Sequence, residues 1–247
     1  GDQKQYFPSK VTINEGALVT GNKGEANSGG FLIANEGVVV TMNGGEFSKN
    51  YASSGGAFMT WRGSTFIMNG GKVTGNSVKN SGGGGYVSSK STFKMNGGTI
   101  SNNTAKTAGG IYLLRANVDL VGGTISNNSA KQEIKIEKGK EVKSGGNAGG
   151  IHIAGSTVNL RGTSFYGNKA ATNGGAIVMG MATYTENGVS RRDTVRVNVY
   201  GGTFSGNSAK NAAGGMLIQS EGTVVNMYGG TVTGNKAKAA GGIYVST

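Results

Sequence analysis

The carboxylates are the residues of this sequence that could most directly do chemistry. Glycoside hydrolysis needs two carboxyl groups roughly 5 to 9.5 Å apart, and the chain has 12 Asp and Glu residues to supply them. Only Glu46 and Asp119 fall clearly on strand-like segments, and they belong to different repeat units. Glu133, Glu137 and Glu141 alternate with lysines in an insertion, which differs from the clustered carboxylates of a calcium-dependent lyase. We therefore expect no catalytic residues and no enzyme activity; a polysaccharide lyase or hydrolase is a less favoured alternative.

Few residues in the sequence could bind a metal ion or a cofactor. His152 is the single histidine, it has no carboxylate neighbour in sequence, and cysteine is absent. The missing cysteines remove disulfides, iron–sulfur clusters and cysteine-bound zinc from consideration. We expect no metal site and no cofactor.

Lysine is the charged residue with the clearest pattern. The formal net charge is +12, from 24 Lys and Arg against 12 Asp and Glu. One lysine or more recurs between an asparagine and the diglycine that follows it, at Lys23, Lys79, Lys106, Lys131, Lys169, Lys210, Lys236 and Lys238. If the repeats stack, these side chains form a basic ridge that attracts a polyanion such as an acidic polysaccharide. The alternative is that they only keep the surface soluble. The chain has no specific nucleic-acid motif.

An internal repeat sets the spacing of these lysines. The segment Gly-Gly-Thr-Val-Thr-Gly-Asn at 229–235 recurs in related form at 201–207, 122–128 and 97–103, and looser copies give a period of about 26 residues. Each unit holds three short strand-like pieces, and no segment has helical periodicity. The repeat predicts an all-β fold, a three-sided parallel β-solenoid of about eight coils. Glycine and asparagine would serve its corners, and the asparagines could hydrogen-bond along its axis.

The strand that leads to each first diglycine shows which side chains face the core. Its apolar positions alternate with polar ones, and this alternation stays in register through seven coils. The inward columns are Val40, Phe66, Phe93, Val118, Val158, Val197 and Val225, and Met42, Met68, Met95, Leu120, Leu160, Val199 and Met227.

A second candidate surface follows the second diglycine of each coil. We expect the middle residue of that strand to face outward, at Leu32, Phe58, Val87, Tyr112, His152, Ile177, Leu217 and Tyr244. Contiguous exposed apolar surface often marks an interaction site. The alternative is that this column packs under an insertion.

Two insertions interrupt the repeat, at about 131–146 and 181–196. Alternation around Gly139 predicts a hairpin in the first, and Asn187-Gly188 predicts one in the second. Insertions in a solenoid often carry binding, so Tyr184, Arg191 and Arg192 are candidate contacts.

Several repeats resemble those of known surface proteins. Gly174-Gly175-Ala176-Ile177 and the segments 47–50, 165–168 and 204–207 are similar to the GGA[ILV] and FxxN repeats of chlamydial-type polymorphic outer-membrane proteins. The Gly-Gly-Thr-Ile-Ser-x-Asn units are similar to those of large bacterial surface proteins. This resemblance covers about residues 20–247 and implies a right-handed parallel β-helix in an adhesin-like or autotransporter-like passenger. It also implies a cell-surface or secreted location, with the signal and anchor outside this sequence.

Taken together, the sequence predicts one monomeric β-helix domain over residues 1–247, cut from a longer repeat array, with residues 1–20 as a divergent first coil or cap. We expect a non-catalytic, adhesin-like module that binds a glycan, an anionic polymer or a host surface protein. The alternative is a passive stalk that displays another domain. Ice binding by threonine pairs such as Thr99/Ser101 is less favoured, because that column breaks at Leu18, Glu46, Lys72 and Ser164.

Overall fold

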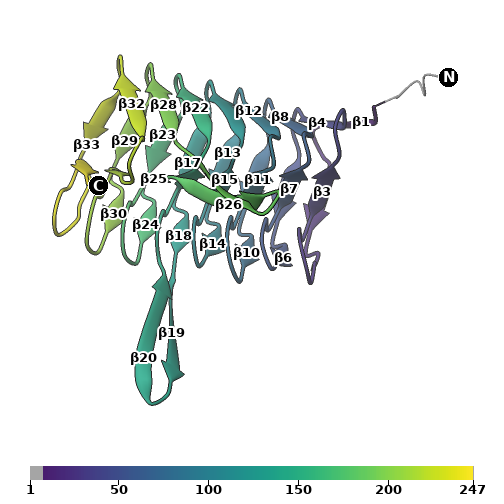
Figure 1. Ribbon diagram of the computed structural model, residues 1–247. Coiled ribbons are helices and arrows are strands. Elements are labelled where there is room, and N and C mark those ends of the chain that lie inside the picture. The colour runs from purple at the N-terminus through teal and green to yellow at the C-terminus, as the bar shows by residue number, and fades with distance from the viewer. Residues whose placement is uncertain (1–7, 247) are drawn as a thin grey trace.

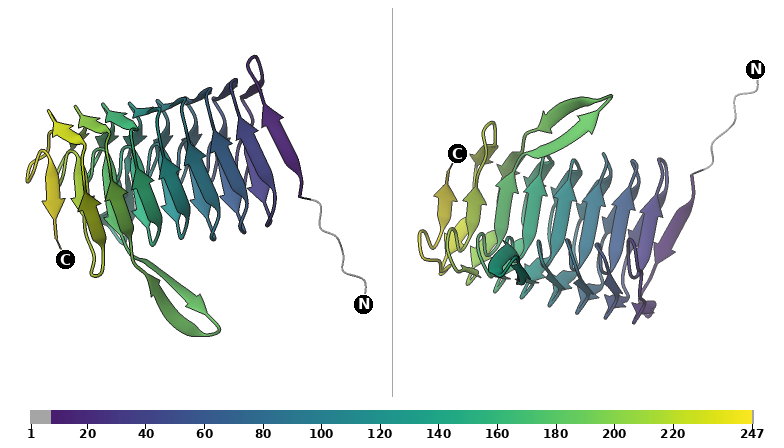
Figure 2. Two further views of the ribbon diagram at one scale, coloured as in Figure 1. Left: turned by 90° about the horizontal axis from the view of Figure 1, so that it is seen from above. Right: turned by 60° about the horizontal axis from the view of Figure 1, so that its bottom comes forward.

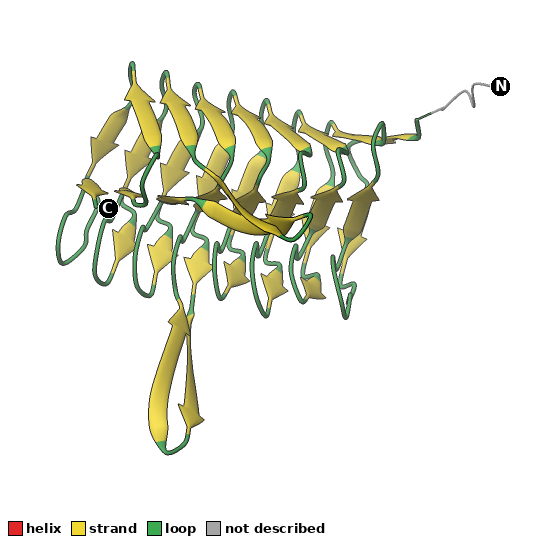
Figure 3. Cartoon of the chain, in the orientation of Figure 1, coloured by secondary structure: helices red, strands yellow, loops and turns green. Residues whose placement is uncertain are grey.

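The computed structural model describes residues 8–246 and shows a stack of β-coils with two hairpins attached (Figure 1). Three parallel sheets of eight strands each run along the stack, and a six-stranded parallel sheet lies at one corner. Strands and loops make up the described part of the chain, which has no helix and hence none that could span a bilayer (Figure 3). The predicted all-β solenoid is therefore confirmed. Its fourth, short sheet was not expected from the sequence.

Sheet A is the face that the alternating columns predicted. It consists of β1 (Lys10–Ile13), β4 (Val39–Met42), β8 (Thr65–Met68), β12 (Thr92–Met95), β16 (Asn117–Leu120), β22 (Thr157–Leu160), β28 (Arg196–Val199) and β32 (Val224–Met227). Val40 pairs with Phe66 and Met42 with Met68, and the same register continues along the sheet. Both columns are buried from β4 to β28, as predicted. In the last coil Val225 is half-buried, and Met227 is 43% exposed.

Sheet B contains the strand before each repeated asparagine. It consists of β2 (Leu18–Thr20), β5 (Glu46–Ser48), β9 (Lys72–Thr74), β13 (Thr99–Ser101), β17 (Thr124–Ser126), β23 (Ser164–Tyr166), β29 (Thr203–Ser205) and β33 (Thr231–Thr233). Its middle residues point into the core. Residues 8–20 provide β1 and β2, which pair in register with β4 and β5 as a first coil. Residues 1–7 of the expected divergent segment lie outside the described residues.

The asparagines after sheet B form a continuous ladder, as the sequence predicted. Nδ2 of Asn103 donates to Oδ1 of Asn128 at 3.0 Å, and the backbone N–H of Asn103 donates to the same oxygen at 3.0 Å. The pattern repeats from Asn22 to Asn235. The left-handed corner conformation belongs to the residue before each ladder asparagine, as at Lys49 (φ 54°) and Gly75 (φ 65°). The ladder asparagine is thus selected for its amide and not for positive φ.

Sheet C is the short corner sheet that follows the ladder. It consists of β6 (Tyr51–Ala52), β10 (Ser77–Val78), β14 (Thr104–Ala105), β18 (Ser129–Ala130), β24 (Lys169–Ala170) and β30 (Ser208–Ala209). The chain then turns back beneath this sheet at very close range. A Cβ on Gly149 would lie 2.5 Å from the backbone nitrogen of Lys169, so only glycine fits there.

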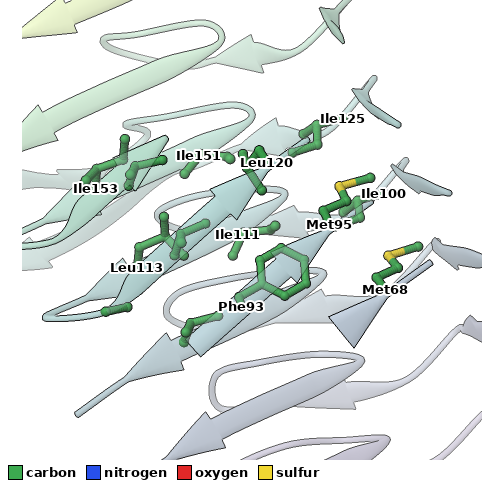
Figure 4. Close-up of a cluster of buried hydrophobic side chains, with 14 of the residues drawn as sticks. Met68, Phe93, Met95, Ile100, Ile111, Leu113, Leu120, Ile125, Ile151 and Ile153 are labelled. Carbon is green, nitrogen blue, oxygen red and sulfur yellow. The ribbon is translucent and has the colours of Figure 1, made fainter. Parts of the chain in front are cut away.

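Sheet D completes the coil after the second diglycine. It consists of β3 (Phe31–Ala34), β7 (Phe58–Trp61), β11 (Gly85–Ser88), β15 (Ile111–Leu114), β21 (Ile151–Ala154), β25 (Ile177–Gly180), β31 (Met216–Ile218) and β34 (Ile243–Val245). Inward side chains of sheets A, B and D, such as Leu120, Ile125 and Ile151, meet in one continuous core (Figure 4). This core holds the coils rigidly enough to fix the positions of their corners.

Both insertions form antiparallel hairpins that leave the body of the stack, β19–β20 as seen in Figure 1 and β26–β27 as seen in Figure 2. β19 (Gln132–Glu137) and β20 (Lys140–Gly145) join sheet C to sheet D, whereas β26 (Ala182–Glu186) and β27 (Val189–Asp193) join sheet D to sheet A. The turn residues have positive φ in both cases, with 50° and 75° at Asn187 and Gly188. These are the values of a type I′ hairpin turn, so the two hairpin predictions are confirmed.

Candidate ligand-binding groove at a corner of the solenoid

The predicted lysine ridge runs along sheet C and the turns that follow its strands, and it consists of two parallel rows. We call the residues directly after the ladder asparagine the first rail, and the residues two positions further on the second rail. In the last four coils the first rail is Ser129, Lys169, Ser208 and Lys236, and the second rail is Lys131, Ala171, Lys210 and Lys238. Residues two apart in a strand point to the same side. The side chains of both rails therefore stand on the outer surface.

The two rails border an open groove of about 770 Å³. Between the rails lies a row of alanines, Ala130, Ala170, Ala209 and Ala237, and the lining also includes Gln132. Five lysines line this groove, at Lys131, Lys169, Lys210, Lys236 and Lys238, and each of them is exposed. No carboxylate is among the lining residues. The groove therefore presents an uncompensated positive potential along four coils.

Hairpin β19–β20 separates this groove from a second one of about 640 Å³. Lys79, Lys106, Lys131 and Lys135 line the second groove, but so does Glu133. The Glu133 carboxylate accepts a hydrogen bond from Lys106 Nζ at 2.7 Å and lies 3.4 Å from Lys135 Nζ. These partners, Lys106 first, hold the pKa of Glu133 below its usual value. Part of the positive charge on this side is thus neutralised within the protein.

Lys23 is the remaining member of the predicted ridge. It pairs with Tyr51 at the N-terminal end of the same corner and lines neither groove. The structure therefore brings together five of the eight ridge lysines in one site and leaves three outside it.

The predicted outward column on sheet D is wrong at three positions. Phe58, Val87 and Ile177 face the core and are fully buried. The outward column consists of Leu32, Met59, Tyr86, Tyr112, His152, Val178, Leu217 and Tyr244. Phe58 and Ile177 are therefore not available as surface contacts.

A shift of one residue in the diglycine explains the error. In two coils an alanine, Ala108 (φ 57°) or Ala148 (φ 61°), takes the left-handed position and Gly-Gly follows it. In two others the first glycine of Gly-Gly-Ala takes that position instead, as Gly55 (φ 60°) and Gly174 (φ 66°) do. Counting from the diglycine therefore placed these strands one residue out of register, which moves every side chain to the opposite face. In the coil with Val87, a run of four glycines hides the same shift.

Part of the outward column, toward its C-terminal end, is covered rather than exposed. Val178 and Leu217 are buried against Ala108, Ala148 and Ala213, which belong to the loops that return from sheet C. Leu32 and Tyr244, near its ends, are 46% and 37% exposed. Val178 and Leu217 thus pack against the protein's own loops, which explains their apolar character without a ligand.

Three aromatic rings in this column form a stack. The Tyr86 and Tyr112 centroids lie 5.0 Å apart, as do those of Tyr112 and His152. Burial raises the pKa of Tyr86 to about 12 and lowers the pKa of His152 to about 4. His152 Nδ1 is buried and has no hydrogen-bond partner. His152 is therefore neutral at physiological pH and contributes packing instead of charge.

One of the three residues predicted as contacts, Tyr184, anchors hairpin β26–β27. Arg115 Nε lies 2.7 Å from Asp193 Oδ2, and the Arg115 guanidinium lies 3.4 Å from the centroid of the Tyr184 ring. Tyr184 therefore fixes the hairpin to the stack. Arg191 and Arg192 are exposed on the hairpin, which starts from a different corner than the lysine groove.

The carboxylates are dispersed in the structure. Asp119 pairs with Arg161 at 3.0 Å, Glu141 with Lys143 at 3.2 Å, and Glu133 with Lys106. Within residues 8–246, no three His, Cys, Asp or Glu side chains lie close enough together to hold a metal ion. That the chain is not an enzyme stays a prediction.

Comparison with known proteins gives no further guide to the site. No protein-family model, curated protein or solved structure matches this chain. Sequence reasoning found the lysines but missed their division into two rails and the pairing of Glu133 with Lys106. The rails could have been found by numbering each lysine from its ladder asparagine.

Proposed function

We propose that this chain is a non-catalytic binding module that holds a linear anionic polymer in the lysine groove. The observation that carries the proposal is the lining itself, in which five lysines on four successive coils face one open groove without a carboxylate. Stacked like charges repel one another, so a polyanion that neutralises them is favoured electrostatically.

The shape of the groove supports a polymer over a compact ligand. It is shallow and runs along the stack, because its lining residues are in-register positions of neighbouring coils. Coils repeat at about 4.8 Å, so a compact anion would reach only some of the five lysines. An extended chain would reach all of them.

Its similarity to surface-protein repeats supports a cell-surface or secreted location and an adhesin-like role. In this proposal an acidic polysaccharide is the ligand, and a host surface protein is the less favoured partner.

A passive stalk is the second candidate, and the asparagine ladder favours it. The ladder and the unbroken core would make the stack a stiff spacer whatever its corners carry. A stalk, however, needs no unpaired lysines in one groove, so polyanion binding separates the two candidates.

The test is a titration of heparin and of polygalacturonate at about 50 and 200 mM salt. With about five ion contacts, affinity should fall about a hundredfold between the two conditions. Lys→Ser changes at Lys131, Lys169, Lys210 and Lys236 together should remove most of the binding at low salt.

The matched control changes four exposed lysines outside the groove, Lys49, Lys72, Lys90 and Lys94, and lowers the net charge equally. Retained binding in the control and lost binding in the groove variant support the site. Equal losses would show that only net charge matters, and an absence of binding to either polymer would favour the stalk.

A further inference from the structure

The groove lysines alternate between the two rails. Going along the stack, Lys131 stands on the second rail, Lys169 on the first, Lys210 on the second and Lys236 on the first. The unused positions carry small residues, Ser129, Ala171 and Ser208. The last coil adds Lys238 on the second rail. The positive charges therefore form a zigzag rather than a single line.

Strand geometry sets the dimensions of this zigzag. Rail positions are two residues apart along a strand, which is about 6.6 Å, and successive coils are about 4.8 Å apart. From Lys131 to Lys236, each step along the stack thus brings one ammonium group on alternating sides, and Lys238 adds a second group in the last coil. A ligand that matches this pattern carries one anionic group per repeat, on alternating sides of a narrow chain.

We propose, resting on the binding function above, that the groove takes an extended 1,4-linked polyuronate with diequatorial linkages, such as β-1,4-mannuronate. In such a chain each pyranose ring carries one carboxylate, and successive rings are flipped, so successive carboxylates lie on opposite sides. Each ring then lies over one coil. The rings lie over the backbone between the two rails, and their carboxylates reach lysines on alternating rails.

The lining disfavours a nucleic acid. Proteins that bind single strands combine a basic groove with aromatic side chains on which bases stack, whereas no Phe, Tyr, Trp or His is among the residues that line this groove.

The test uses the intact chain and a charge-neutral exchange, Lys169→Ser with Ala171→Lys. This double change moves one ammonium group from the first rail to the second, so the charge count of the groove is kept and its alternation is lost. Serine already occupies the equivalent first-rail position in the neighbouring coils, and lysine the equivalent second-rail position. Exchange of Lys72 and Thr99, which are paired on sheet B outside the groove, is the matched control, made as Lys72→Thr with Thr99→Lys.

Hexamers of β-1,4-mannuronate, α-1,4-galacturonate and phosphate are titrated by calorimetry at low salt. The wild type and the control variant should prefer the mannuronate hexamer. The rail exchange should lower the affinity for this hexamer about fivefold, which corresponds to the contribution of one exposed ion pair. The galacturonate hexamer, whose diaxial linkages give a buckled chain, should bind the wild type and the exchange variant alike.

Two results would overturn the polyuronate assignment and leave the binding function standing: unchanged mannuronate affinity in the exchange variant, or tighter binding of the phosphate hexamer by the wild type. If neither the hexamers nor the long polymers bind, the proposed function itself fails.

Discussion

The asparagine ladder makes a strong prediction about stability. Asn128 is fully buried, and its side chain takes part in four hydrogen bonds: it accepts from the backbone N–H and Nδ2 of Asn103 and donates to Oδ1 of Asn168 and to the carbonyl of Ile100. Asn128→Ala removes all four and leaves the buried N–H of Asn103 without this acceptor. Each unsatisfied buried group costs about 1 to 3 kcal/mol, so the free energy of unfolding should fall by about 3 to 5 kcal/mol.

Asn96→Ala is the matched control for this substitution. Asn96 is exposed and donates one side-chain hydrogen bond, to Asn69 Oδ1 at 2.7 Å, so its loss should cost less than about 0.5 kcal/mol. Urea unfolding followed by circular dichroism measures both losses. Stacked repeats need not unfold in one step, so the variants are compared only where the dependence of the unfolding free energy on urea concentration has the same slope. A loss below about 1 kcal/mol for Asn128→Ala, or equal losses in the two variants, would refute the view that the buried ladder holds the coils together.

Three further outcomes follow from the packing. Gly149→Ala should lower the free energy of unfolding by about 2 kcal/mol or more, because its Cβ would lie 2.5 Å from a backbone atom. Gly242→Ala, whose Cβ would have its nearest neighbour at 3.6 Å, should be nearly neutral in urea unfolding. Equal effects of the two changes would contradict this. Phe58→Ala should lower the free energy of unfolding by about 3 to 5 kcal/mol, and Met59→Ala by much less. The reverse order would indicate that Phe58 faces outward, as the sequence had predicted. Burial lowers the pKa of His152 to about 4 in the folded protein, whereas in the unfolded chain the pKa is about 6.5. Below pH 6.5 the unfolded chain therefore binds a proton that the folded protein does not, and the free energy of unfolding should fall by up to about 3 kcal/mol as the pH falls from about 6.5 to 4. His152→Phe should abolish that decrease, and an unchanged pH profile would show that other groups cause it.

The architecture was predictable because one periodic signal determines it. Inward positions such as Phe66 and Met68 must be apolar in every coil, so the alternation survives in the sequence even where individual residues vary. The hairpin turn at Asn187-Gly188 was predictable for a local reason, since few residues adopt its positive φ angles.

What could not be predicted depends on exact register or on contacts between distant segments. Phe58 was assigned to the wrong face because Gly-Gly-Ala and Ala-Gly-Gly look interchangeable in sequence, although they place the left-handed residue differently. The two-residue strands of sheet C are too short to give a periodic signal. Arg115, which anchors the second hairpin through Asp193, lies 78 residues away from it in the chain, so no local pattern connects them.

The central claim is that a polyanion lies in the lysine groove, and a lysine footprint tests it most directly. The chain is acetylated with and without polymannuronate at low salt, and the modification of each lysine is measured by mass spectrometry. We predict protection of Lys131, Lys169, Lys210, Lys236 and Lys238, with Lys49, Lys72, Lys90 and Lys94 modified equally in both samples. Protection spread evenly over both groups, or confined to the second group, would contradict the account.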